Sequence, residues 1–361
     1  MAADSAGALR LLFYLPSLAG GGAERLLAQL GTGLRQRGHE ITFVVDTDSA
    51  ENAGFLDVGI RKVRLGPNHL ANVIRLARLL RKVRPDASLS ALSGQNLKHM
   101  LAAILVGRLP RAVQSYHGFF EGEPRLLSRL SYFLTPLSSR LMTRTVCVSE
   151  ALREELVRRF HASPARTIRI HNGVARAGAS DVSARYRNDE TPIVLACGRL
   201  SPDKNYPFLL RAFARMKHPN TRLVILGEGP ERGAIEAEIA RLNLQDRVSL
   251  PGYTDAAPWY EEASCFAITS TREAFGLVVV EALAAGLPVV ATTSGGPDEI
   301  LQNGRWGRVV AQGDETGFAA ALDAALDEPG DPAVRIARAN DFSIEKCVEA
   351  YEALFYEIAR R

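Results

Sequence analysis

Two glutamates occupy an otherwise apolar stretch of the sequence, residues 271–293, which reads TREAFGLVVVEALAAGLPVVATT. Glu273 opens the stretch, and Glu281 follows eight residues later. An ionised carboxylate that is removed from water is strongly unfavourable unless a partner compensates it. We therefore expect Glu281 either to lie on a solvated face or to meet a ligand that the chain does not supply.

The apolar run CFAITS just before Glu273 is typical of a strand, and Phe275, Gly276 and Leu277 are expected to begin a helix whose free N–H groups favour a phosphate. On a continuous helix Glu281 would lie roughly 12 Å along the axis from Glu273. Such a separation differs from the roughly 5 Å pairing of carboxylates in a retaining glycoside hydrolase. The two acids are therefore predicted to contact different parts of one long ligand, and a nucleotide sugar would fit.

Two cations lie on the loop GRLSPDKN, residues 198–205, at the expected carboxyl end of another strand. Arg199 offers a planar fork of N–H donors and Lys204 a point charge, a combination that suits a diphosphate. The alternative is a solvated loop with ordinary surface charges. Strand-end placement favours the phosphate site.

Three glycines, residues 20–22, separate the first expected strand from the first expected helix. Gly21 and Gly22 would let backbone N–H groups approach an anion or a sugar at the helix N-terminus. The dinucleotide fingerprint GxGxxG is not met, because Arg25 stands at its third glycine. We expect a contact with an anion or a sugar rather than a nicotinamide cofactor, with a plain tight turn as the alternative.

Strand-like apolar runs alternate with helical periodicity from end to end, which predicts α/β architecture with parallel sheets. The alternation pauses over residues 171–192, which are polar and rich in Gly, Ser and Asp. We therefore predict two doubly wound, Rossmann-like domains, 1–175 and 176–342, with a last helix over about 343–361 that could pack back on the first. Two such domains are expected to leave a cleft at the carboxyl edges of their sheets, where ligands bind in this architecture.

The net charge of +4 hides an asymmetry between the two halves. Residues 1–175 hold 24 Lys and Arg against 13 Asp and Glu, or +11, and the remainder holds 20 against 27, or −7. We predict that the first half meets an anionic partner such as a membrane surface, with surface arginines of a GC-rich genome as the alternative. The basic residues fit no known nucleic-acid-binding module, so no nucleic acid is expected.

The chain carries no run of 18 uncharged apolar residues and no basic segment ahead of its first apolar run. The expected location is therefore cytoplasmic, with peripheral attachment to the inner membrane as a further expectation. A two-lobed solute-binding protein is disfavoured because it would need an export signal. The four cysteines show no metal-ligand spacing, and the first three, which sit in apolar runs, are predicted to be small core residues in a reducing compartment.

The pattern EAFGLVVVE is similar to the E-x7-E motif of retaining glycosyltransferases of the GT-B fold, and nearly the whole chain resembles glycosyltransferase family four. Seven further motifs follow in the order that this family shows: GGGAER, VSE, HNGV, GRLSPDKN, LGEGP, VSLPGY and SGGPDEIL. The resemblance implies a hexosyltransferase that retains anomeric configuration by front-face attack, without a cofactor or metal ion. A UDP-sugar is the favoured donor and a GDP-sugar the second choice. The alternative activity is that of a nucleotide-sugar 2-epimerase of the same fold.

The same resemblance implies a role for each matching residue. Arg199 and Lys204 would bind the donor diphosphate, Glu273 the donor sugar and Glu281 the ribose. Further donor contacts would come from the backbone N–H groups of Phe275, Gly276 and Leu277.

Three further residues resemble positions of the family's site. His117, after the apolar segment LPRAVQSY, looks like the active-site histidine, and the alternative is a structural one. Tyr253 would contact the base of the nucleotide, and the alternative is a packed core tyrosine. Gly227, with Glu228, would lie under the nucleotide, and the alternative is a plain turn. Catalytic roles are thus expected for His117, Glu273, Arg199 and Lys204.

Residues 118–144 are rich in aromatic and leucine side chains and carry Arg125, Arg129, Arg140 and Arg144. A basic amphipathic stretch can lie in an anionic membrane interface or hold a lipid diphosphate, and the alternative is a helix hairpin packed on its own sheet. The predicted acceptor is therefore a saccharide or a lipid-linked saccharide, of the polyprenyl-diphosphate or lipopolysaccharide type.

Overall fold

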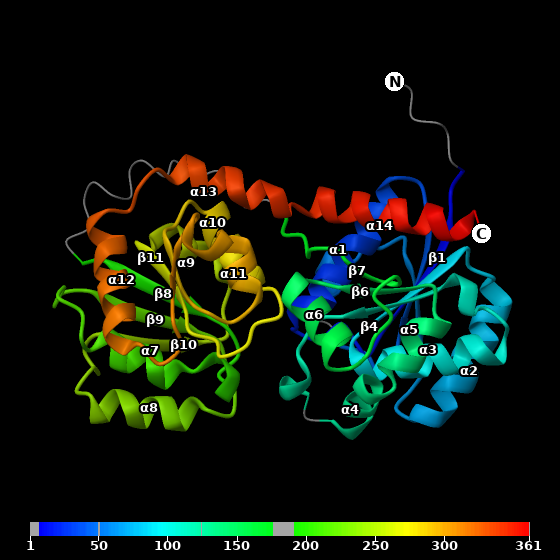
Figure 1. Ribbon diagram of the computed structural model, residues 1–361, viewed down its shortest axis with the longest axis horizontal. Helices are drawn as coiled ribbons and strands as arrows, with labels where there is room; N and C mark the ends of the chain where they lie inside the picture. Colours follow the sequence, from blue (N-terminus) through cyan, green and yellow to red (C-terminus); the bar gives the residue numbers. More distant parts are fainter. Residues whose placement is uncertain (1–6, 50, 124, 176–190, 361) are drawn as a thin grey trace. The chain divides into compact units, whose positions relative to one another are not determined.

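The computed structural model describes residues 7–49, 51–123, 125–175 and 191–360 (Figure 1). The chain divides into two compact units, which are described separately. Unit 1 comprises residues 1–173 together with 344–361, and unit 2 comprises residues 174–343.

Unit 1 is built on a seven-stranded sheet with the order β3-β2-β1-β4-β5-β6-β7, in which all neighbours are parallel. Both faces are covered by helices, so the central strands are almost wholly buried, although two of them carry Ser or Gln side chains among the apolar ones. The strands are β1 (Arg10–Leu15), β2 (Glu40–Val45), β3 (Arg61–Arg64), β4 (Ala87–Ala91), β5 (Ala112–Tyr116), β6 (Arg144–Cys147) and β7 (Thr167–Arg169).

The helices of unit 1 form one layer on each side of this sheet. Side chains alternate along β1: Phe13 packs in the core with α1 and α14, whereas Tyr14 packs with α2. The helices are α1 (Gly22–Gln36), α2 (His69–Val83), α3 (Ser93–Leu105), α4 (Leu126–Phe133), α5 (Thr135–Leu141), α6 (Glu150–Arg158) and α14 (Ile344–Ala359), with short 3-10 turns η1 (Ala53–Phe55), η2 (Leu109–Arg111) and η3 (Phe120–Gly122).

The last helix, α14, belongs to unit 1 although it ends the chain. The rings of Phe355 and Phe13 lie 6.0 Å apart between their centroids, in the core under α1. At the surface Arg37, which caps α1, donates to Glu352 at 2.7 Å. An apolar stripe and ion pairs along its flank thus fix α14 to the first unit.

Unit 2 is built on a six-stranded parallel sheet with the order β10-β9-β8-β11-β12-β13. Its strands are β8 (Ile193–Cys197), β9 (Arg222–Leu226), β10 (Val248–Gly252), β11 (Cys265–Ile268), β12 (Val289–Thr292) and β13 (Arg308–Val310). Its helices are α7 (Tyr206–Phe213), α8 (Arg232–Arg241), α9 (Ala257–Glu262), α10 (Leu277–Ala284), α11 (Gly296–Leu301), α12 (Glu315–Asp327) and α13 (Pro332–Ala339), with η5 (Pro202–Lys204), η6 (Gln302–Gly304) and η7 (Asn340–Phe342). The strand order reverses between β8 and β11, the point at which ligands bind in open parallel sheets.

The predicted α/β architecture with two doubly wound parallel sheets is confirmed. In the described part of the chain no helix combines the length and the apolarity needed to cross a bilayer. Cys147, Cys265 and Cys347 are buried free thiols, and Cys197 is a half-buried one.

Candidate active site

The loops that follow five strands of unit 2 are joined by backbone hydrogen bonds at the carboxyl edge of the sheet. The Gly227 N–H, after β9, donates to Gly252 O at the end of β10. The Leu200 N–H, after β8, donates to Glu228 O at 3.0 Å. The Thr271 N–H, after β11, donates to the Asp203 carbonyl oxygen at 2.8 Å. The loop after β12 joins through backbone hydrogen bonds to Glu273. These bonds gather the predicted donor-binding residues of unit 2 along one edge.

Lys204 and Glu273 form an ion pair between Lys204 Nζ and Glu273 Oε2. Their side chains are only 20% and 17% exposed. Burial lowers the pKa of Lys204, but the attraction of the Glu273 carboxylate outweighs it and holds the pKa above its ordinary value. Lys204 is therefore charged at neutral pH, and the cation predicted to bind phosphate lies against the acid predicted to meet the sugar.

The backbone of Glu273 is tied to the loop after β12. Its N–H donates to Ser294 O at 2.9 Å, and its carbonyl oxygen accepts from the Gly296 N–H at 2.8 Å. A side chain at position 296 would place Cβ 2.3 Å from the Phe275 backbone, so only glycine permits this approach. Glu273 thus lies in an extended segment ahead of α10. The expected helical spacing between the two glutamates is wrong, because the helix begins four residues after Glu273.

Helix α10 begins at Leu277, and Gly276 caps it with φ at +93°, a conformation that glycine adopts without strain. The Phe275 side chain is 3% exposed and packs edge-on against Phe342, with centroids 5.7 Å apart. Phe275 therefore anchors the turn through its ring. Any contact it makes with a donor must come from its backbone, as expected.

The half-buried Glu281 carboxylate has a partner on the chain that the sequence did not reveal. The hydroxyl of Tyr260, on α9, donates to Glu281 Oε2 at 3.0 Å. Tyr260 is 7% exposed, so its hydroxyl holds the carboxylate from the core side. The segment WYEEAS gives no signal for this contact, because α9 and α10 meet only through the tertiary fold.

Gly227 is required by close packing of two loops. Its φ is +137°, and a Cβ atom there would lie 2.0 Å from the Gly198 carbonyl oxygen. The backbone of the loop after β9 therefore packs directly against the loop that carries Arg199 and Lys204. Arg199 itself is exposed, and Tyr253 is 72% exposed, so Tyr253 is not a packed core tyrosine.

In unit 1, Gly22 is the first residue of α1 and Gly21 is its N-cap in extended conformation. The Asn52 side chain, 5% exposed, donates to the carbonyl oxygens of Ala19 and Gly21 and holds this turn. The Glu24 carboxylate lies over Gly21, within 2.2 Å of where a Cβ atom would be, and burial raises its pKa. A carboxylate here favours ligand hydroxyl groups over phosphate at the glycine loop.

His117 follows β5 directly, and its Nε2 lies 3.0 Å from Ser115 Oγ. Burial lowers its pKa to about 4, so the imidazole is neutral at pH 7. Its Nδ1 is buried, and within the described residues it has no hydrogen-bond partner. A buried ring nitrogen in this state is suited to accept or donate one hydrogen bond with a ligand.

A buried polar cluster at the carboxyl edge of the first sheet was not anticipated from the sequence. Asp46, after β2, is 6% exposed and pairs with Lys98 of α3, which is 2% exposed. The same carboxylate accepts from the Tyr14 hydroxyl at 2.7 Å and from the Asn72 and Gln95 side-chain amides at 2.8 and 3.1 Å. Because every one of these bonds is internal, we interpret the cluster as a brace that fixes α2 and α3 on the sheet.

The four arginines predicted for the acceptor side separate into two groups. Arg125 is exposed at the start of α4, Arg129 stacks on the Phe120 ring at 4.5 Å, and Arg140 is exposed on α5. Arg144 differs, because it begins β6 and its Nη2 lies 2.5 Å from Glu357 Oε1 of α14. Arg144 thus links the last helix to the sheet of unit 1 and is not part of the amphipathic stretch.

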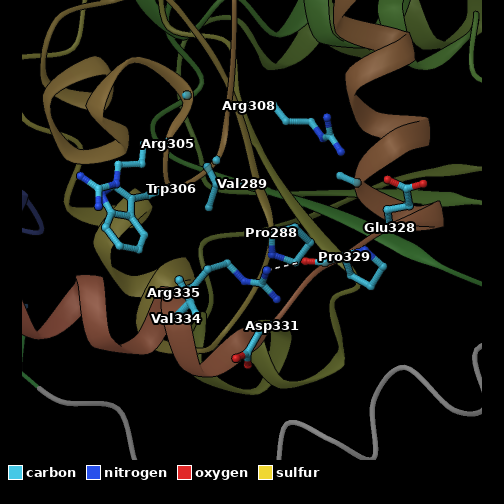
Figure 2. A pocket seen from close by; sticks show the side chains of 13 residues that line it. Pro288, Val289, Arg305, Trp306, Arg308, Glu328, Pro329, Asp331, Val334 and Arg335 are labelled. Carbon is cyan, nitrogen blue, oxygen red and sulfur yellow. Dashed lines mark hydrogen bonds between the residues drawn. The ribbon is translucent and has the colours of Figure 1, made fainter.

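A cavity of about 370 Å³ opens elsewhere on unit 2, at the amino ends of β12 and β13 (Figure 2). Pro288, Trp306 and Glu328 line it, and the Arg335 guanidinium donates to the Pro329 carbonyl oxygen beside it. None of the predicted site residues lines this cavity. Among the described residues no group of three or more His, Cys, Asp or Glu side chains is placed to hold a metal ion.

Family models match most of the chain. The family described as glycosyl transferases group 1 matches residues 181–341, and glycosyltransferase family 4 matches residues 20–177. Both matches fall in the order and position of the two units. This chain is a family-four glycosyltransferase.

Relatives of this glycosyltransferase include the lipopolysaccharide core biosynthesis glycosyltransferase LpsE of Rhizobium meliloti (strain 1021), 29% identical over 84% of this chain and 85% of that protein. An N-acetylgalactosaminyltransferase of Campylobacter jejuni that acts on a diphospho-undecaprenol saccharide is 32% identical over 48% of each chain. Among solved structures, Anabaena HepE in complex with UDP and glucose has a TM-score of 0.82 at 21% identity, over 96% of this chain and 99% of that one. The fold is therefore GT-B, and the protein is an enzyme of the glycosyltransferase class.

Proposed function

We propose that this enzyme transfers a hexose from a UDP-sugar to a saccharide or lipid-linked saccharide, with retention of anomeric configuration and without a metal ion. The observation that carries the proposal is the Lys204–Glu273 ion pair at the carboxyl edge of the second sheet, immediately ahead of the α10 N-terminus. A charged lysine and helix N–H groups are the elements needed to stabilise a diphosphate leaving group. The adjacent acid supplies an acceptor for sugar hydroxyls.

The donor would lie along the edge of unit 2. Arg199 is exposed on the loop that carries Lys204 and is free to swing toward a diphosphate, for which its planar fork is suited. Glu281 would accept the two ribose hydroxyls, since Tyr260 already orients one of its oxygens. Exposed Tyr253 and the tight turn at Gly227 would flank the base. Prearranged charge of this kind lowers the barrier without a metal ion.

Unit 1 would contribute hydrogen bonds rather than charge. Neutral His117 has a buried Nδ1 suited to a sugar hydroxyl, and Glu24 beside Gly21 suits hydroxyls as well. In the proposed reaction the bond from the anomeric carbon to the UDP oxygen breaks while the acceptor oxygen attacks from the same face. The departing phosphate takes the acceptor proton.

The lipid-linked acceptor rests on the relatives. One is named for lipopolysaccharide core biosynthesis, and another for transfer to a diphospho-undecaprenol saccharide. The UDP preference rests on the Anabaena HepE complexes with UDP and UDP-glucose. A GDP-sugar remains the second choice for the donor.

A thermal-shift panel of UDP-, GDP- and ADP-sugars tests the donor, because a specific ligand raises the apparent stability. We expect a UDP-sugar to raise Tm, and a response confined to another base would overturn the UDP assignment. Product analysis by NMR then reads the anomeric configuration, and an inverted product would reject retention. Turnover in excess EDTA tests metal independence.

The second candidate, a nucleotide-sugar 2-epimerase, uses the same fold and the same nucleotide. It would convert a UDP-sugar in the absence of an acceptor, whereas the transferase releases UDP only when an acceptor is present. Incubation of the purified enzyme with the UDP-sugar alone, followed by sugar analysis, separates the two. A changed sugar still attached to UDP would favour the epimerase.

A further inference from the structure

Exposed large hydrophobic side chains gather on one layer of helices in unit 1. Of the thirteen recorded in the described part of the chain, nine lie on α2, α3, α4 and α5. They are Leu70, Ile74, Leu101, Ile104, Leu105, Leu126, Leu130, Phe133 and Leu137, and we call the surface they form the α2–α5 face. Exposed apolar side chains that cluster in this way mark an interaction surface, whereas scattered ones need no explanation.

The four helices form one continuous layer. Helix α2 contacts α3, and α3 contacts α4 and α5 (Figure 1). Leu101, Ile104 and Leu105 make a stripe at i, i+3 and i+4 on α3, which is the middle helix. Because the middle helix also carries exposed apolar side chains, the apolar surface extends across the layer and is not confined to its edge.

The charges of the layer are all of one sign. The four helices hold seven basic residues and no acidic residue. The exposed basic side chains are Arg75, Arg78, Arg81 and Lys82 on α2, Arg129 on α4 and Arg140 on α5, with Arg125 exposed just before α4. Interspersed leucines and arginines without carboxylates are typical of a surface that meets an anionic, apolar phase.

Carboxylates that border the layer are already engaged. Glu121 pairs with Arg159, Glu123 accepts from the Ser93 hydroxyl at 2.6 Å, and Asp86 accepts from the Arg10 N–H at 2.9 Å. Within the described residues, the four basic side chains of α2 have no carboxylate partner. Their positive charge is therefore not cancelled within unit 1.

We infer that the α2–α5 face lies in the interface of an anionic phospholipid bilayer, with its leucines and Phe133 at the acyl boundary and its arginines among the headgroups. Phe133 is 63% exposed, and Arg129 keeps its guanidinium close to the apolar surface by stacking on Phe120. A second copy of the chain fits less well, because a symmetric contact would oppose one arginine-rich helix with another. The inference concerns unit 1 alone and holds whatever unit 2 transfers, although it would bring the enzyme to the surface where lipid-linked acceptors reside.

Vesicle flotation of the full-length protein, without donor or acceptor, tests the inference. We expect flotation with vesicles of phosphatidylcholine and about 30% phosphatidylglycerol, weak flotation with phosphatidylcholine alone, and loss of flotation as salt rises. A charge variant, Arg78→Ala, Arg81→Ala and Lys82→Ala, should reduce partitioning roughly tenfold or more. An apolar variant, Leu70→Ser, Leu105→Ser and Leu126→Ser, should reduce it by a similar factor.

Control variants remove basic or apolar side chains elsewhere on the surface. They are Arg61→Ala with Lys217→Ala and Arg222→Ala, and Val58→Ser with Val334→Ser, and they should float like the unmodified protein. Absent flotation of the unmodified protein, or equal flotation of both variants and controls, would overturn the inference. So would a dimer in sedimentation velocity that the apolar variant dissociates, since a second copy would then cover the face.

Folding of each variant is checked by circular dichroism and by its thermal unfolding without ligand, whereas the Tm shift with UDP tests the proposed donor site of unit 2. If a triple variant does not fold, the single change Leu126→Ser, at a side chain 83% exposed, keeps the test decisive. A protein that floats but responds to none of the UDP-, GDP- and ADP-sugars of the panel would contradict the proposed transferase function and leave the membrane face intact.

Discussion

Lys204 Nζ and Glu273 Oε2 form an ion pair that links the loop after β8 to the loop after β11. Both side chains are about four-fifths buried, so removal of one charge leaves the other uncompensated. If the lysine also meets a phosphate, then the acid and the ligand share one cation.

Glu273→Gln should lower turnover by about 100-fold, because the sugar loses its charged acceptor in the transition state. The affinity for UDP should be retained or slightly increased, since Lys204 is released from its partner. Turnover with the donor found in the thermal-shift panel and calorimetry with UDP measure the two effects. Glu238→Gln, at a pair on the surface of α8, is the matched control. Parallel losses of turnover and UDP affinity would argue against the assigned role.

Tyr260→Phe should weaken UDP binding by about 3- to 10-fold, because a buried hydroxyl that orients Glu281 is lost. Glu281→Gln should weaken it more, and the double variant should be no worse than Glu281→Gln alone, since Tyr260 acts through the carboxylate. Calorimetry with UDP measures all three proteins. Additive losses would show that Tyr260 acts on the nucleotide independently of Glu281.

Turnover should be insensitive to protonation of His117 between pH 5.5 and pH 8, because burial lowers its pKa to about 4. The imidazole is then neutral throughout and acts through a hydrogen bond rather than a charge. His117→Ala should reduce turnover by about 10- to 100-fold without creating a new pH dependence in this range. A wild-type profile with an inflection near pH 6.5 that disappears in His117→Ala would contradict this.

His99 makes stability depend on pH. The residue is fully buried between Ser88 Oγ and Ser90 Oγ, at 2.9 and 3.0 Å, and burial lowers its pKa from 6.5 to about 4. Between these two values the unfolded chain binds a proton that the folded protein does not, so the free energy of unfolding falls as the pH falls. The drop amounts to about 3 kcal/mol by pH 4 and is absent above pH 7.

His99→Gln should remove that part of the acid destabilisation. Urea unfolding at pH 7 and at pH 4.5 gives the difference between the two pH values for each protein. His117 contributes its own similar drop in both proteins, so the comparison isolates His99. An identical pH dependence in wild type and His99→Gln would reject the assignment.

Gly227→Ala should destabilise unit 2 by about 2–4 kcal/mol, because its Cβ would lie 2.0 Å from the Gly198 carbonyl oxygen and its φ of +137° is strained for alanine. UDP affinity should fall as well, since the loop with Arg199 and Lys204 would be displaced. Gly233→Ala on α8 is the control, because nothing lies within 4 Å of the added atom. Equal stability of the two variants in urea would show that the close approach is not required.

Much of the candidate site could be read from the sequence because it is encoded locally. Arg199, Lys204 and Glu273 each follow an apolar strand, and parallel strands bring their carboxyl ends to one edge wherever the sheet forms. Patterns of neighbouring residues also made it possible to predict the two domains, the alternation of strands and helices, and the family motifs. Arg144 was misplaced for the opposite reason, because its pairing with Glu357 joins residues 213 apart in the chain and has no local signal.

The sequence by itself determined which residue types stand at the strand ends, since hydrophobic periodicity and short motifs are properties of neighbouring residues. Only the tertiary structure decided their partners: Tyr260 beside Glu281, Lys204 against Glu273, and Lys98 against Asp46. It also decided that exposed leucines stand on four helices that contact one another. Contacts of this kind depend on how helices pack across a sheet, and no local pattern of apolar and polar residues specifies that packing.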